Sequence, residues 1–175
     1  AQQWHWSYRL PGEDGEFGNV SAKLITNENP FGMDYDDPVG QDDILISSPE
    51  LHLPVNVPVN LNLRAKDVLH NFTVAEFRVK MDMVPGMVTS MWFTPTKTGR
   101  YDLLCEELCG IAHHAMRGAV IVDEAEDYEN WVASHPTLNE TQIRMAYNPE
   151  ASVAASQYAV CAACHGQQGE GMVVL

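Results

Sequence analysis

Residues 100 to 123 read RYDLLCEELCGIAHHAMRGAVIVD, a short loop between two apolar segments. The pattern predicts a strand from Arg100 to Leu104 and a second, fully apolar strand from Gly118 to Asp123. The loop carries two thiols, an imidazole and a thioether, from Cys105, Cys109, His113 and Met116. These ligand types together select a soft metal, and copper is the first-row metal that uses all three. The segment therefore predicts a copper site on a loop between two strands.

The residues before this segment predict further strands. From Leu51 to Leu63 apolar residues alternate with polar residues or proline, which indicates one half-buried strand or two strands joined at a bend. Pro54 and Pro58 fall on the outward face and favour an edge strand or a bulge. Additional strands are expected at residues 3–8, 22–26, 68–77, 79–83 and 88–94. Short strands separated by turns predict a mainly β fold, a Greek-key barrel or sandwich.

Helical periodicity is present only after the last predicted strand. Apolar residues spaced at i, i+3 and i+4 predict a short helix from Tyr128 to Val132. A second helix is expected around Ile143 to Tyr147, and a third from Ala151. The β fold is therefore expected to end in short C-terminal helices.

The composition excludes some partners. The chain has 175 residues and a formal net charge of −14, which argues against nucleic acid and favours a basic protein partner. Ten of the acidic residues lie between positions 13 and 50, where Lys23 is the one basic residue. This stretch is expected to form long loops, either a docking surface or a solvated face. We find no pattern of a membrane helix or a signal peptide and expect a mature form or a soluble fragment.

A complete copper site needs a ligand from outside the loop. His70, 35 residues before Cys105 and near the start of a predicted strand, is the candidate. Two thiolates spaced in this way can bridge two copper ions, with His70 and His113 capping one ion each. Met116 and a backbone carbonyl would then be weak axial ligands. His114 is expected at the surface, and no role is assigned to the other histidines, which are His5, His52 and His135.

Three other interpretations of the cysteines were weighed. A zinc site more often has C-x2-C spacing and no thioether. A mononuclear blue-copper site uses one cysteine, whereas this loop has two. Disulfide bonding within either cysteine pair is the third alternative, although a histidine follows each pair closely, which favours metal or haem.

The second cysteine pair forms a haem-attachment motif. Cys161, Cys164 and His165 give C-x-x-C-H, in which the cysteines form thioethers to the haem and the histidine is the proximal iron ligand. Ten residues follow His165, and Met172 is too near to be the distal ligand. We expect the parent protein to carry haem c, and we do not expect this chain to hold a stable six-coordinate haem.

The metal loop resembles the dinuclear copper A loop of cytochrome c oxidase subunit II, C-x-E-x-C-G-x-x-H-x-x-M. Three other segments resemble the same family: DVLHNF at 67–72, KMDMVPG at 80–86 and QWHWSY at 3–8. The likeness covers about residues 2 to 135, with four motifs in order. One departure is Met87, where the family usually has arginine; it concerns an ion pair to the partner subunit and not the copper site.

The resemblance implies a cupredoxin-like domain with a defined ligand set. Cys105 and Cys109 would bridge the coppers, and the other ligands would be His70, His113 and Met116. Glu107 would contribute its carbonyl oxygen, and its side chain would reach a magnesium ion shared with the catalytic subunit. Trp4 would be the point where electrons arrive from cytochrome c.

The resemblance also implies an organisation and a location. Residues 1–135 would form the copper A domain, 136–150 a linker, and 151–175 the truncated start of a cytochrome c-type domain. The family has two membrane helices before the QW motif, so this chain resembles the exposed domain, at the periplasmic face of the bacterial inner membrane. Electrons would pass to the haem of catalytic subunit I, where oxygen is reduced.

Two other functions compete with this one, and the second of them belongs to a different class. The copper A domain of nitrous oxide reductase tends to have tryptophan where Glu107 stands. A copper-binding or assembly protein would store metal without relaying electrons and would not need Trp4 or the acidic loops. A quinol-oxidase relative would have lost the copper ligands, which are all present.

Overall fold

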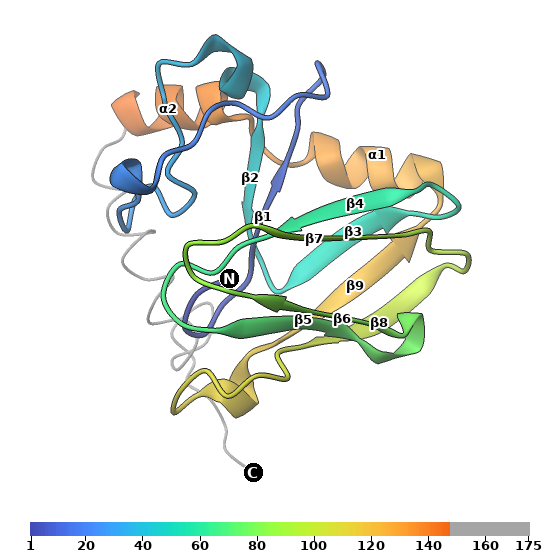
Figure 1. Ribbon diagram of the computed structural model, residues 1–175. Helices are drawn as coiled ribbons and strands as arrows, with labels where there is room; N and C mark the ends of the chain where they lie inside the picture. Colours follow the sequence, from blue (N-terminus) through green and yellow to red (C-terminus); the bar gives the residue numbers. More distant parts are fainter. Residues whose placement is uncertain (148–175) are drawn as a thin grey trace. The chain divides into compact units, whose positions relative to one another are not determined.

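The computed structural model describes residues 1–147 (Figure 1). These residues belong to two compact units. One unit comprises Ala1–Tyr8 and Ile46–His135, and the other comprises Arg9–Leu45 and, among the described residues, 136–147. The strands β1 (Ser7–Leu10) and β2 (Ile44–Ser47) each cross the boundary between the units and pair in a two-stranded sheet. Every predicted metal ligand lies in the first unit.

The first unit is built on a five-stranded sheet, seen in Figure 1 as a curled set of strands. Its strands, in spatial order, are β3 (Glu50–Pro54), β9 (Arg117–Asp123), β8 (Gly99–Leu104), β5 (His70–Val74) and β6 (Val79–Met83). β3 runs parallel to β9, and the other neighbours are antiparallel. A separate antiparallel pair consists of β4 (Val59–Leu63) and β7 (Thr89–Phe93). The predicted mainly β fold is confirmed.

The core of this unit lies against the inner faces of the strands. Leu51 and Leu53 of β3 are buried while their neighbours are partly exposed, as the alternating sequence predicts. β5 differs because all five of its residues are buried. Phe72 of β5 meets Trp6 edge to face, with ring centroids 6.1 Å apart. Each large apolar side chain buried in this way contributes about 1.5–3 kcal/mol to stability, so the strands that carry the metal ligands are firmly held.

The alternating segment from residue 51 to 63 forms two strands joined at a bend. Asn56 has φ of 61° between them, a left-handed conformation that asparagine tolerates better than most residues. This pair of strands agrees with one of the two predicted alternatives. Two predictions for other segments are wrong in detail. The aromatic strand begins at Ser7 and not at residue 3, because the backbone turns at residues 3 and 4 and two hydrogen bonds between Gln2 and His5 close that turn. Residues 22–26 do not form a strand but contain the 3-10 helix Ala22–Leu24, capped by Ser21.

The strand expected at 68–77 is shorter than predicted, because β5 ends at Val74 and the 3-10 helix Ala75–Phe77 follows. Both predicted helices are present in the described residues, as α1 (Ala125–Ala133) and α2 (Leu138–Tyr147). The start of α2 is fixed by a reciprocal capping box between Thr137 and Glu140. The helix predicted from Ala151 lies outside the described residues. None of the described helices is long and apolar enough to span a membrane.

The second unit contains most of the acidic loop. It includes the 3-10 helix Pro38–Asp42 and is organised around Asp43, whose side chain is fully buried. The carboxylate pairs with Arg9 and accepts a bond from Gly18 N at 3.1 Å. The backbone carbonyl of Asp43 accepts a bond from Leu138 N at 2.7 Å. Asp43 therefore stabilises this unit and does not belong to a solvated face.

Candidate metal centre

The metal loop connects β8 to β9, and both of its ends are fixed. Leu104 pairs with Arg117 in the sheet, and Cys105 N donates to Met116 O at 3.3 Å. The first residue of the loop is therefore held against the last. Thr73 of β5 pairs with Leu104, so His70, three residues earlier on an antiparallel strand, lies beside the loop. The sheet register thus delivers the distant ligand.

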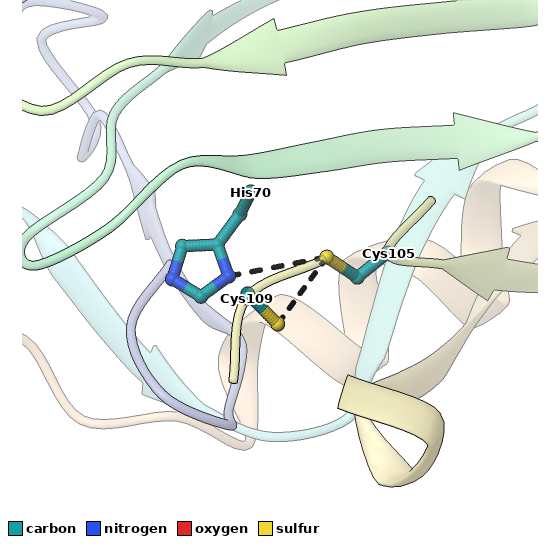
Figure 2. A group of neighbouring side chains, drawn as sticks. All are labelled: His70, Cys105 and Cys109. Carbon is teal, nitrogen blue, oxygen red and sulfur yellow. Dashed lines mark hydrogen bonds between the residues drawn. The ribbon is translucent and has the colours of Figure 1, made fainter. Parts of the chain in front are cut away.

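Three buried side chains form the centre of the site (Figure 2). The two sulfur atoms of Cys105 and Cys109 are 3.8 Å apart, and both thiols are free. His70 Nδ1 lies 3.9 Å from Cys105 Sγ. Donors bound to one ion at roughly 2.3 Å in tetrahedral geometry are about 3.8 Å apart. The spacing therefore fits donors arranged to share a metal, and it excludes a disulfide, whose sulfur atoms are about 2.05 Å apart.

Three further donors surround this group. His113 Nδ1 is 3.5 Å from Cys109 Sγ, and Met116 Sδ is 3.8 Å from the same sulfur. The backbone carbonyl of Glu107 is 3.3 Å from Cys105 Sγ. Each thiol thus has its own imidazole: His70 is next to Cys105, and His113 is next to Cys109. Two thiolates with separate capping groups fit a pair of metal ions better than one ion.

Asp67 orients His70, and the sequence analysis missed it. His70 Nε2 lies 2.8 Å from Asp67 Oδ1, which leaves Nδ1 free to bind a metal. Burial lowers the pKa of His70, against the opposing effect of Asp67, and favours the neutral imidazole that binds metals. Burial raises the pKa of Asp67, but hydrogen bonds from Gln3, His70 and Val68 outweigh it and lower that pKa. The sequence feature that could have identified Asp67 is its position three residues before His70.

The cysteines of the site need a cation beside them if they are to be deprotonated. Burial, together with the neighbouring Cys105, raises the pKa of Cys109 to about 12. A buried thiolate therefore needs a positive charge beside it, and a metal ion provides that charge. Two thiolates, two imidazoles and a thioether are the soft and borderline donors that copper accepts. The residues present fit a copper centre.

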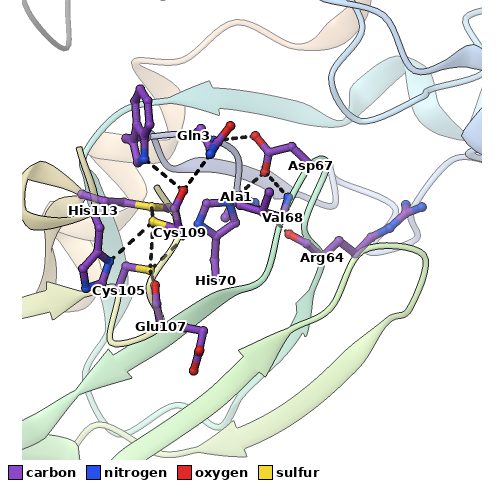
Figure 3. Close-up of polar contacts among 12 residues, drawn as sticks. Ala1, Gln3, Arg64, Asp67, Val68, His70, Cys105, Glu107, Cys109 and His113 are labelled. Atoms are coloured by element: carbon purple, nitrogen blue, oxygen red, sulfur yellow. Dashed lines mark hydrogen bonds and ion pairs between the residues drawn. The ribbon is translucent and has the colours of Figure 1, made fainter. Parts of the chain in front are cut away.

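Residues 3 and 4 lie against the loop. The indole Nε1 of Trp4 donates to Cys109 O at 3.2 Å, and Gln3 Nε2 donates to the same oxygen at 2.7 Å. Figure 3 shows Gln3 bonded to both Cys109 and Asp67. Trp4, a predicted site residue, thus contacts the backbone of a candidate ligand directly. Gln3 is a second residue that the sequence analysis did not single out.

The side chain of Glu107 and two histidines that were not predicted as ligands, His52 and His114, form no part of the group around the sulfur atoms. The carboxylate of Glu107 points away from the thiols (Figure 3). His114 is exposed, as predicted. His52 has a structural environment, since it bonds to Asp123 at 2.5 Å and stacks on Trp131. The haem-motif residues, Cys161, Cys164 and His165, lie outside the described residues.

A curled β-sheet that carries free cysteines, histidines and a methionine on a loop between two strands defines a cupredoxin-like metal-binding domain. The sequence model described as "Cytochrome C oxidase subunit II, periplasmic domain" matches residues 1–124. This chain belongs to that family.

Curated relatives agree with the family match. The alternative cytochrome c oxidase subunit 2 of Bradyrhizobium diazoefficiens is 54% identical over 138 residues, which are 79% of this chain and 50% of the relative. Cytochrome c oxidase subunit 2 of Thermostichus vulcanus is 52% identical over 86 residues, 49% of this chain and 26% of the relative. This chain therefore spans half the length, or less, of these relatives.

Two solved structures share the fold. The periplasmic domain of subunit II of cytochrome oxidase from Bradyrhizobium japonicum is 30% identical, with a TM-score of 0.54; the match covers 76% of this chain and 86% of that one. A mixed disulfide intermediate between a thioredoxin-like protein and subunit II of cytochrome c oxidase has a TM-score of 0.51 at 30% identity, and the match covers 77% and 84%. Both support the cupredoxin-like assignment.

Proposed function

We propose that this domain is the electron-transfer module of a haem-copper terminal oxidase and holds a dinuclear copper A centre. It accepts electrons from a cytochrome c and passes them to the haem of catalytic subunit I, where oxygen is reduced. The observation that carries the proposal is the pair of buried thiols 3.8 Å apart, each with its own imidazole. Membership of the subunit II family supports it.

The protein's part is to hold the ligands. Cys105 and Cys109 would hold the two ions between them, and His70 and His113 would each bind one ion. Met116 and the Glu107 carbonyl would be the weak ligands. When bound, the copper pair supplies one-electron redox chemistry shared over two ions. Because the loop is tied at both ends and His70 is fully buried, these residues would hold the ions in a nearly fixed arrangement.

Trp4 is the proposed point where electrons enter. Its indole N–H bonds to the carbonyl of Cys109, so a short path runs from the ring through one hydrogen bond into the ligand's own backbone. The acidic loops of the second unit attract a basic donor. Association of this kind slows as salt screens the charges, so the rate of electron uptake should fall with ionic strength.

The family resemblance supports further parts of the proposal. Catalytic subunit I is the proposed partner, contacted through Lys80–Gly86, and the Glu107 side chain reaches a magnesium ion at that interface. Since that carboxylate points away from the sulfur atoms, it is free for a second role. The proposed location is the periplasmic face of the bacterial inner membrane, with anchoring by segments other than this chain.

The C-terminal motif extends the proposal to the parent protein. Cys161, Cys164 and His165 attach haem c in a cytochrome c-type domain that begins near residue 151 and relays electrons to the copper centre. The copper A domain then covers residues 1–135, with 136–150 as the connection. A haem stain on denatured protein tests this part, because covalently attached haem survives denaturation.

Copper reconstitution tests the main proposal. The chain is reduced, loaded with copper and examined by electron paramagnetic resonance. A spectrum of one unpaired electron shared equally by two coppers is expected. A mononuclear cupric spectrum, or no copper uptake, would refute the dinuclear centre. Rapid mixing with reduced cytochrome c then separates an electron-transfer domain from a metal-storage protein, which would take up copper but not the electron.

A further inference from the structure

Gln3 contacts both halves of the metal site. Its side-chain Nε2 donates to Cys109 O at 2.7 Å, and its backbone N donates to Asp67 Oδ2 at 2.7 Å (Figure 3). Cys109 lies on the loop after β8, whereas Asp67 orients His70 at the start of β5. One residue of the N-terminal segment thus bonds both to the ligand Cys109 and to Asp67, the partner of His70, which are 42 positions apart in sequence.

The fit of this segment on the loop is close. Gly110 has φ of +121°, and a Cβ built there would lie 2.7 Å from Gln3 Nε2 and 3.1 Å from the Trp4 ring. A glycine is therefore required both by its backbone conformation and by the side chains that cover it. The Gln3 amide and the Trp4 indole approach the carbonyl of Cys109 together, and each donates to it.

We propose that Gln3 is a positioning residue for the copper centre: it holds the Cys109 backbone and the Asp67–His70 pair in fixed relative positions and seats Trp4 against the loop. This inference rests on the proposed dinuclear centre. Gln3 touches no metal-binding atom, so it acts through Cys109 and Asp67. The bond to the Cys109 carbonyl is made by the side chain, and substitution therefore removes it and leaves the backbone bond to Asp67.

The consequence is a slower opening of the loop. For copper to leave, the Cys105–Met116 loop must move away from His70, and the Gln3 amide resists this movement by one hydrogen bond. Removing a group that orients a metal ligand typically weakens metal binding by roughly tenfold or more. Trp4, as a second donor to the same oxygen, retains part of the restraint.

The test compares three variants of the full chain. Gln3→Ala removes the donor, and Gln3→Glu places a carboxylate oxygen against the carbonyl. Gln2→Ala is the matched control, since no side-chain hydrogen bond of Gln2 is found among the described residues. Each protein is loaded with copper, and release to an excess of chelator is followed through the visible absorption of the centre. We expect release about tenfold faster for Gln3→Ala, faster still for Gln3→Glu, and within twofold of the parent for Gln2→Ala.

Two further readouts separate positioning from general stability. The copper hyperfine pattern of the loaded Gln3→Ala variant should differ from that of the parent, while the thermal midpoint of its metal-free form should not. The inference is overturned if Gln3→Ala releases copper at the parent's rate and has the parent's spectrum. It is also overturned if the metal-free form of Gln3→Ala is destabilised as much as its copper-loaded form. If the unmutated chain forms no dinuclear centre, the proposed function is wrong. That outcome is seen without any variant and is therefore distinct from a failure of the inference about Gln3.

Discussion

The imidazole Nε2 of His70 lies 2.8 Å from a carboxylate oxygen of Asp67, and the opposite ring nitrogen faces Cys105 Sγ at 3.9 Å. The carboxylate therefore selects the tautomer that can bind the metal. Asp67→Asn keeps the size of the side chain but loses the charge and one acceptor. We expect copper affinity to fall 10–100-fold, as is typical when such a partner is removed.

A competition titration against a chelator of known affinity measures this change. Asp102→Asn, at an exposed position on β8, is the matched control and should bind copper as the parent does. Equal affinities for Asp67→Asn and the parent would show that the imidazole needs no orienting carboxylate.

Substitutions of His70 and His114 should have different effects on the copper centre. His70 is fully buried beside Cys105, whereas His114 is exposed. His70→Ala should abolish the mixed-valence spectrum, and His114→Ala should leave it nearly unchanged. Electron paramagnetic resonance at equal copper loading makes the comparison, and a normal spectrum from His70→Ala would remove that residue from the ligand set.

The thiol pair must be reduced before metal can bind. With the two sulfur atoms 3.8 Å apart, a small movement brings them to the bonding distance of about 2.05 Å. We expect oxidised chain to take up less than a tenth of the copper bound by reduced chain, with full recovery after reduction. Thiol titration and copper analysis on the same samples measure both quantities. Substantial copper uptake by chain without free Cys105 and Cys109 would contradict the ligand assignment.

His5 gives the fold a predictable response to acid. Burial lowers the pKa of His5, which bonds to Ser7 Oγ at 2.7 Å. The unfolded chain then binds a proton near the ordinary value of about 6.5 while the folded chain does not. Stability from this residue is present above that pH and is lost as the pH falls from about 6.5 toward the lowered value, by at most about 1.4 kcal/mol per pH unit.

Chemical denaturation of the metal-free chain between pH 7.5 and 5.5 tests the effect. His5→Gln should lose less stability over this range than the parent, because groups common to both proteins cancel in the difference. If the two proteins lose equal stability, His5 does not titrate differently on folding.

The donors of the site could be predicted from sequence because most of them lie in twelve consecutive residues. His70 was predicted from its place near a strand start, and the register between Thr73 and Leu104 explains why it reaches the loop. Gln3 could not be found in this way. It is 106 residues from Cys109, and a single amide bonding to a backbone carbonyl has no periodicity or composition that marks it.

Asp43 shows a second limit of the sequence. It is one of the ten acidic residues between positions 13 and 50, a segment whose composition predicts a solvated or docking face. In the structure it is buried and paired with Arg9, 34 positions earlier. The composition of a segment gives the number of its carboxylates. It does not tell which carboxylate forms an ion pair, because that depends on which residues the fold brings together.

In the proposed function the acidic loops attract the donor and other residues hold the metal, and these two sets of residues fall in different units. Nine of the ten acidic residues between positions 13 and 50 fall in Arg9–Leu45, while all six candidate copper ligands fall in the other unit. Mutations that retune the attraction for a donor can therefore accumulate without altering any ligand. Under the proposed function, a lineage of such domains could therefore change its electron donor and keep its metal centre.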